Sequence, residues 1–223
     1  MKLLVLLIID RLVLFIFRQI LIDTILTWNV LIPEKIQIII TLLRENMDQI
    51  EPRLVHIAAG SGFITKQVSE AMVLYDLPFE NIATDSKEES IAQVFNYFPV
   101  STATALETIE QYPTCRAFFV SRGRAFMLPV LQEILKLHPD GPLIFILATE
   151  GRYGSCEPNE FFDLLSQENF EHIMINDGLI EFSGVDKNDH LFIYYRNACV
   201  DNTLLEIKPL TENKQLTEDK SDY

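Results

Sequence analysis

The chain has 223 residues and a formal net charge of −14, with 32 Asp and Glu against 18 Lys and Arg. Contacts to phosphates need Lys and Arg, so this charge argues against nucleic acid as a partner and favours a small molecule or a basic protein. The three cysteines are far apart and show no C-x-x-C spacing, which argues against a disulfide framework and a metal site and favours reduced thiols in the cytoplasm.

Residues 1–25 are strongly apolar, and we expect them to form a helix. Four charged residues interrupt this stretch: Asp10, Arg11, Arg18 and Asp23. A membrane span needs about 20 apolar residues without charges, and a signal peptide needs a longer apolar core with a small-residue cleavage site, so the stretch fits neither. Packing of the helix on the protein body is the first expectation. Peripheral attachment to a membrane surface, or dimerisation, is the second, and the oligomeric state stays open.

Hydrophobic periodicity places further elements in alternation along the chain. Helices are expected over residues 34–50, 63–75, 105–112, 127–138 and 159–167, and strands over 54–58, 81–85, 115–121, 142–150, 172–177 and 190–197. This alternation predicts an α/β fold with a parallel sheet covered by helices on both faces. The last two strands have no obvious helix between them, so we expect an antiparallel hairpin at one edge of the sheet.

Composition divides the chain into three expected segments. Residues 1–50 form a helical extension packed on the core, and residues 51–200 form the α/β domain. Residues 201–223 are polar and charged, which is typical of a disordered tail.

Three expected strand ends carry residues suited to a ligand: Ala59-Gly60-Ser61-Gly62, Asp85 and Thr149-Glu150. Ligands of open parallel sheets bind beyond the carboxyl ends of the strands. Glycine lets the backbone lie close to a ligand, and the helix that follows directs free N–H groups towards it. Asp85 follows Gly60 by about 25 residues and can accept hydrogen bonds from ribose hydroxyls. The pattern predicts a nucleotide-type ligand, with a plain strand-to-helix turn and a helix-capping Asp as the alternative.

AAGSGFIT (58–65) followed by IATD (82–85) resembles the nucleoside-binding half of the S-adenosylmethionine-dependent methyltransferase fold. Three stretches are similar to an uncharacterised branch of methyltransferase-like proteins: WNVLIP (28–33), RAFFVSRGRAFMLPVLQEIL (116–135) and ATEGRYGSCEPNEFF (148–162). The resemblance runs from about Trp28 to Arg196. It implies a class I, Rossmann-like three-layer sandwich with a mostly parallel seven-stranded sheet, an antiparallel last strand and extra N-terminal helices.

The resemblance also implies roles for individual residues around S-adenosylmethionine as cofactor. The loop residues that lie under the methionine part are Ala59, Gly60, Ser61 and Gly62. Asp85 holds the ribose hydroxyls, and Ser101 and Thr102 flank the adenine. Ser121 sits where many members carry the residues that face the methyl group. In this chain Ser121-Arg122-Gly123-Arg124 replaces the usual Pro-Pro-containing run, and Ala58-Ala59 replaces the more usual acidic or glycine residue.

Glu150 is the best candidate for acid–base chemistry, because a carboxylate at the end of a buried strand is desolvated and its pKa rises. Its alternative role is as a helix cap or a partner for Arg152. His56 lies inside an expected strand and is interpreted as a core histidine. The first hypothesis is a methyltransferase of unknown acceptor, with Glu150 and Ser121 near that acceptor. The alternative is a non-catalytic Rossmann-like scaffold whose N-terminal helix docks to a partner or a membrane, and the lack of a Pro-Pro-aromatic run after Ser121 favours it.

Overall fold

The structure, a computed structural model, describes residues 33–86, 97–121, 126–149, 159–175 and 190–200. The strands are β1 (Arg53–Ile57), β2 (Glu80–Asp85), β3 (Val100–Thr102), β4 (Ala117–Ser121), β5 (Leu143–Thr149), β6 (Glu171–Ile175) and β7 (His190–Arg196). The helices are α2 (Pro33–Glu45), α3 (Phe63–Leu74), α4 (Ala105–Gln111), α5 (Met127–Leu137) and α6 (Asn159–Gln167).

The strands form a single sheet in the order β3-β2-β1-β4-β5-β7-β6. All pairs from β3 to β5 are parallel, whereas β7 runs antiparallel to both of its neighbours, β5 and β6. The expected Rossmann-like α/β sandwich, with a mostly parallel seven-stranded sheet and a reversed last strand, is therefore confirmed. The final hairpin does lie at one edge, but β6 is the edge strand and β7 fills the position inside it.

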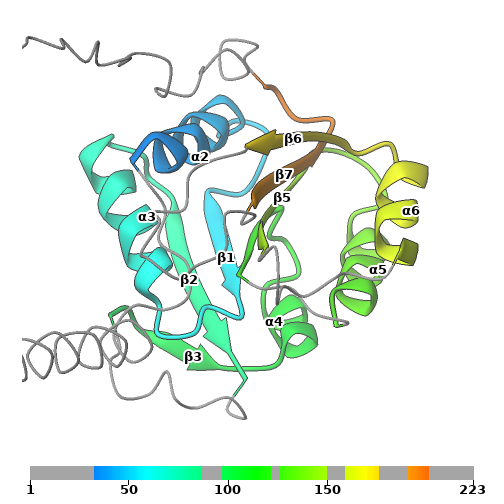
Figure 1. The fold of residues 1–223 in the computed structure, drawn as a ribbon, viewed down its shortest axis with the longest axis horizontal. Coiled ribbons are helices and arrows are strands. Elements are labelled where there is room, and N and C mark those ends of the chain that lie inside the picture. Colours follow the sequence, from blue (N-terminus) through cyan, green and yellow to red (C-terminus); the bar gives the residue numbers. More distant parts are fainter. Residues whose placement is uncertain (1–32, 87–96, 122–125, 150–158, 176–189, 201–223) are drawn as a thin grey trace, which may run out of the picture.

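Alternation along the strands builds a core on each face of the sheet. In β1, Leu54 packs in the cluster that includes α2 and α3, whereas Val55 and Ile57 pack in the cluster of α5 and α6. In β4, Phe119 belongs to the first cluster and Phe118 to the second. Figure 1 shows the resulting layers, with α2 and α3 on one side of the sheet and α4, α5 and α6 on the other. Both faces are covered, as a parallel sheet requires.

Helix α2 is part of this core, because five of its residues are buried against the sheet and α3: Ile38, Ile39, Ile40, Leu42 and Leu43. The expected helix over 34–50 is too long, since α2 ends at Glu45 and residues 46–50 form turns. Asn46 ends the helix by turning its side-chain amide back to the carbonyl of Leu42.

The segment division proposed from the sequence stays a prediction, because residues 1–32 and 201–223 lie outside the described part of the chain. The expected helix over residues 1–25 falls there too. Among the helices that the structure describes, none is long and apolar enough to cross a bilayer.

Candidate functional site at the carboxyl edge of the sheet

The loop from β1 to α3 crosses over the carboxyl end of β2. Ala58, Gly60 and Gly62 all have positive φ angles, of 55°, 57° and 74°. The loop is attached to β2 through two hydrogen bonds: the Ala59 N–H donates to the Thr84 carbonyl at 3.0 Å, and the Gly60 N–H donates to Asp85 Oδ2 at 2.6 Å. The glycine loop and the acidic residue, which the sequence analysis placed at the ends of consecutive strands, therefore form one connected unit.

The start of α3 lies at this edge without a side-chain cap. Gly62 is the N-cap residue and has no side chain to accept from the first-turn N–H groups, and the first turn carries no acidic residue. Ser61, directly before it, is 5% exposed, and its Oγ has no hydrogen-bond partner among the residues that the structure describes. A buried hydroxyl normally finds a partner, so Ser61 is a candidate contact for a bound polar group.

Gly62 has a packing role in addition to its place in the loop. A Cβ atom built on it would lie 2.8 Å from Phe98 Cβ and 3.0 Å from Val100 Cγ2. The backbone N–H of Tyr97 also donates to the Ser61 carbonyl, and the Tyr97 ring lies edge-on to Phe63 at 5.1 Å between centroids. Residues 97–100 are therefore packed tightly against the loop, and Gly62 is needed for that approach whether or not a ligand is bound.

The two β3 residues expected near adenine lie on opposite faces of the sheet. Thr102 is in register with Asp85, and Ser101 is in register with Thr84. The Thr84 side chain faces α4, where its hydroxyl accepts from Thr108 at 2.9 Å. Since successive strand residues alternate, Thr102 shares the face of Asp85 whereas Ser101 shares the face of Thr84. Both side chains are exposed.

Ser121, at the end of β4, lies next to a buried imidazole. Its Oγ is 2.8 Å from His56 Nε2, and His56 Nδ1 is 2.6 Å from the hydroxyl of Thr65 on α3. The His56 ring packs against Phe119 at 4.5 Å between centroids. Burial lowers the pKa of His56 to about 3, so the ring is neutral at physiological pH.

His56 is thus a core histidine, as expected, but it also connects Ser121 to α3, which the sequence interpretation missed. The available signal was a histidine in an otherwise apolar buried strand, because such a side chain needs hydrogen-bond partners. Its partners could not be named, since Ser121 is 65 residues away in the chain.

Glu150 lies outside the described residues, as do Arg122 and Arg124. The structure follows β5 only to Thr149, so the predicted role of Glu150 stays a prediction. Phe126, half-buried, packs with the core cluster of α5 and α6. Among the described residues, no group of three or more His, Cys, Asp or Glu side chains could hold a metal ion.

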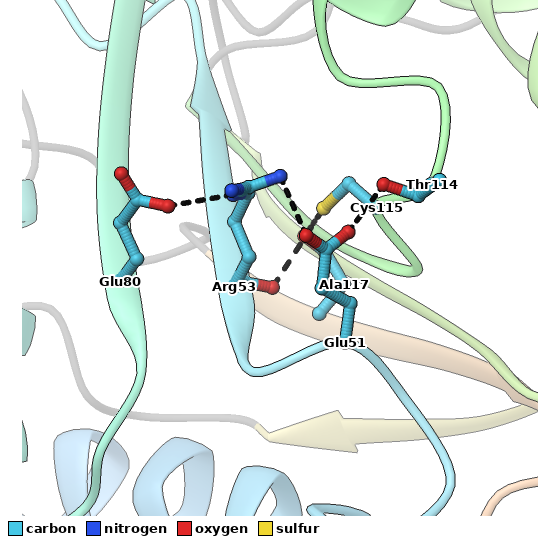
Figure 2. A network of polar contacts seen from close by, with 6 residues as sticks. All are labelled: Glu51, Arg53, Glu80, Thr114, Cys115 and Ala117. Carbon is cyan, nitrogen blue, oxygen red and sulfur yellow. Dashed lines mark hydrogen bonds and ion pairs between the residues drawn. The ribbon is translucent and has the colours of Figure 1, made fainter.

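A second polar network lies at the other ends of the strands, the amino ends of β1, β2 and β4. Figure 2 shows Arg53, at the start of β1, between Glu51 and Glu80. The guanidinium nitrogens lie 2.7 Å from a Glu51 carboxylate oxygen and 2.8 Å from a Glu80 carboxylate oxygen. The thiol of Cys115 donates to the Ala117 carbonyl at 3.2 Å, and burial raises the pKa of this thiol to about 12. Arg53 joins β1 to β2 through Glu80, and the Cys115 thiol reaches the Arg53 carbonyl at 3.7 Å, so these contacts fasten the amino ends of β1, β2 and β4 together.

No family model matches the chain, and neither does any curated protein. Solved structures do match, and three methyltransferases are among them. The precorrin-6y C5,15-methyltransferase of Geobacter metallireducens is 13% identical, with a TM-score of 0.45 over 70% of this chain and 87% of that chain.

A S-adenosylmethionine-dependent methyltransferase of Archaeoglobus fulgidus is 13% identical, with a TM-score of 0.41 over 72% of this chain and 94% of that chain. The O-methyltransferase TomG of Streptomyces achromogenes, in complex with S-adenosylmethionine, is 13% identical, with a TM-score of 0.44 over 70% of this chain and 77% of that chain. At this identity the similarity concerns the fold alone, and the fold is established by the strand order and directions described above.

Proposed function

We propose that the chain is a S-adenosylmethionine-dependent methyltransferase that holds its cofactor at the carboxyl edge of β1, β2 and β4. The observation that carries the proposal is the unit formed by the Gly60 N–H, the Asp85 carboxylate and the buried Ser61 hydroxyl, which has no partner among the described residues, at the start of α3, where Gly62 provides no side-chain cap. The sequence of this unit resembles the cofactor-binding loop of that family.

The residues present fit such a cofactor. Asp85 places a carboxylate beside the Gly60 loop, and carboxylate oxygens accept hydrogen bonds from ribose hydroxyls. The Ser61 hydroxyl, which has no partner among the described residues, and the first N–H groups of α3 suit the polar, partly anionic methionine part. Thr102, on the same face as Asp85, is suited to contact the nucleoside.

The cofactor supplies an already activated methyl group on a sulfonium centre. The protein therefore has to orient the two reactants and exclude water, and a dedicated acid–base pair is not essential. Asp85 and the Gly60 loop fix one reactant on the sheet edge. Ser121, from strand β4 next to β1, would face the methyl-bearing part of the cofactor and the acceptor beyond it, and its hydroxyl is held by His56. The acceptor itself is a small molecule or a protein of a class that the described residues do not define.

Calorimetric titration with S-adenosylmethionine and S-adenosylhomocysteine tests the proposal. Two variants separate the functions of Asp85: Asp85→Asn keeps a carbonyl acceptor for the Gly60 N–H but removes the charge, and Asp85→Ala removes both. We expect the alanine variant to bind about tenfold to a hundredfold more weakly, which is the effect of losing hydrogen bonds to a charged group. The asparagine variant should fall between it and the wild type.

Asp76→Asn is the matched control, because Asp76 is exposed at the far end of α3 and its φ of 51° suits asparagine. It should bind like the wild type. Absence of binding to both compounds at millimolar concentration would overturn the proposal and leave a non-catalytic scaffold on this fold. Equal binding by wild type and Asp85→Ala would place the cofactor elsewhere.

A further inference from the structure

A continuous hydrogen-bonded chain runs from the inside of the protein to the carboxyl edge of the sheet. It begins at the hydroxyl of Thr65 in α3, passes through both nitrogens of His56 in β1 and ends at the hydroxyl of Ser121 in β4. Thr65 is 1% exposed and His56 is 2% exposed, whereas Ser121 is half-buried. Of these three residues, only Ser121 can therefore contact a ligand.

The burial of Thr65 fixes the direction of these hydrogen bonds. A buried hydroxyl hydrogen needs an acceptor, and the imidazole is the one partner that the described residues offer to this hydroxyl. The Thr65 hydroxyl therefore donates to Nδ1. A neutral imidazole that accepts at Nδ1 carries its proton on Nε2, so Nε2–H donates to Ser121 Oγ.

The opposite direction would leave a buried hydrogen without a partner. If Nδ1–H donated to Thr65, the hydrogen of Thr65 would have no acceptor among the described residues. The Ser121 hydrogen would then point inwards to Nε2, and Ser121 could only accept hydrogen bonds from a ligand. In the favoured direction, Ser121 accepts from His56 and keeps its own hydrogen for the outside.

We propose that His56 and Thr65 are positioning residues that hold the Ser121 hydroxyl as a hydrogen-bond donor towards a lone-pair atom of the bound ligand. The identity of the ligand rests on the proposed function, and S-adenosylhomocysteine is the probe, because it carries a carboxylate and a thioether sulfur that can accept. The role is distinct from nucleophilic activation, in which the imidazole would accept from the serine.

The first test reads the tautomer directly and needs no ligand. Long-range proton–nitrogen NMR correlations of labelled wild-type protein distinguish the two ring nitrogens, and the signals missing from His56→Gln assign the ring. We expect a neutral ring protonated at Nε2 at pH 7. A ring protonated at Nδ1, or at both nitrogens, would overturn the proposal.

The second test is a double-mutant cycle on binding of S-adenosylhomocysteine. Ser121→Ala should weaken binding about threefold to tenfold. Thr65→Val, which is nearly isosteric, should weaken it in the same direction, although Thr65 is too deeply buried to touch the ligand. Thr65→Ser keeps the hydroxyl and should restore wild-type affinity.

The double variant decides whether Thr65 acts through Ser121. If it does, Thr65→Val/Ser121→Ala binds no more weakly than Ser121→Ala alone, because the shared interaction is already lost. Multiplication of the two single effects would indicate a merely structural role and overturn the proposal. If Thr65→Val does not fold, two measurements still test the proposal. They are the tautomer of the wild-type ring and the affinity of Thr65→Ser compared with that of Ser121→Ala.

Failure of this proposal and failure of the proposed function have different signatures. Cofactor binding that is sensitive to Asp85 but insensitive to Ser121 would keep the function and remove the donor role. Absence of all binding would remove the function, and the tautomer would still show whether Ser121 is held as a donor.

Discussion

The Asp85 carboxylate accepts a hydrogen bond from the backbone N–H of Gly60, with Oδ2 2.6 Å from the nitrogen. A hydrogen bond to a charged acceptor is about twice as strong as a neutral one, and this one holds Gly60 at a φ of 57°. The end of β2 therefore shapes the loop that follows β1. Asp85 therefore has two roles in the site: it positions the Gly60 loop, and it supplies a carboxylate next to that loop.

The first prediction concerns the Gly60 amide. Asp85→Ala should increase its hydrogen-exchange rate by about tenfold or more, because the amide loses a charge-assisted bond of more than about 1 kcal/mol. Asp85→Asn should show a smaller increase, and Asp76→Asn none. Exchange measured by NMR on the ligand-free protein checks this. An unchanged rate in the alanine variant would mean that the loop keeps its shape without the carboxylate.

The second prediction separates backbone strain from crowding at Gly62. Gly62→Ala combines a left-handed φ with contacts of 2.8 Å to Phe98 Cβ and 3.0 Å to Val100 Cγ2, and should lower the free energy of unfolding by about 2–4 kcal/mol. Gly141→Ala shares the positive φ, at 87°, but meets only the flexible end of Arg116. We expect a loss of about 1–2 kcal/mol there. Urea unfolding of both variants gives the difference, and equal losses would remove crowding as the cause.

The sequence predicted the elements well where a local pattern determines them. The short apolar runs of β1 and β4 and the apolar spacing of α3 and α5 placed these elements to within two residues, because each pattern depends only on the element's own residues. The reversed strand β7 was predicted from the short link before it. Its position between β5 and β6 was not, because strand order depends on contacts between distant segments.

In the candidate site, too, local features could be predicted from the sequence, whereas contacts between distant segments could not. The strand-end location of Gly60, Asp85 and Ser121 followed from the predicted topology, and the structure brings the Gly60 loop and Asp85 into contact. The bond between Ser121 and His56 could not be predicted, because it depends on the register between β1 and β4. That register sets which two side chains meet, and no spacing within the sequence encodes it.

The third prediction is a pH dependence caused by His56. Burial lowers the pKa of its folded state to about 3, against about 6.5 for an unfolded chain. The unfolded state therefore binds a proton below pH 6.5 while the folded state does not, so the stabilisation present above pH 6.5 is lost as the pH falls towards 3. The contribution of His56 to the free energy of unfolding changes by up to about 1.4 kcal/mol per pH unit.

Urea unfolding of wild type and His56→Gln between pH 4 and 8 measures that contribution as a difference, which cancels the titration of the carboxylates. The two curves should run parallel above pH 7 and converge as the pH falls below 6.5. His56→Leu is the second variant if the glutamine variant does not fold. Parallel curves over the whole range would show that the ring is protonated equally in both states.

The last prediction concerns Asn46, which joins the end of α2 to the segment after β7. Its fully buried side chain donates to the carbonyls of Leu42 and Cys199, each at 2.8 Å, and accepts from the Cys199 N–H at 2.7 Å. Asn46→Ala leaves these groups unpaired and should lower the free energy of unfolding by about 2–4 kcal/mol. Gln49→Ala is the control, because Gln49 also contacts Cys199, through its thiol at 3.2 Å, but is exposed. It should change the free energy of unfolding by less than about 0.5 kcal/mol. Equal, small effects of the two variants in urea unfolding would mean that water replaces the Asn46 contacts and that α2 is held by its apolar face alone.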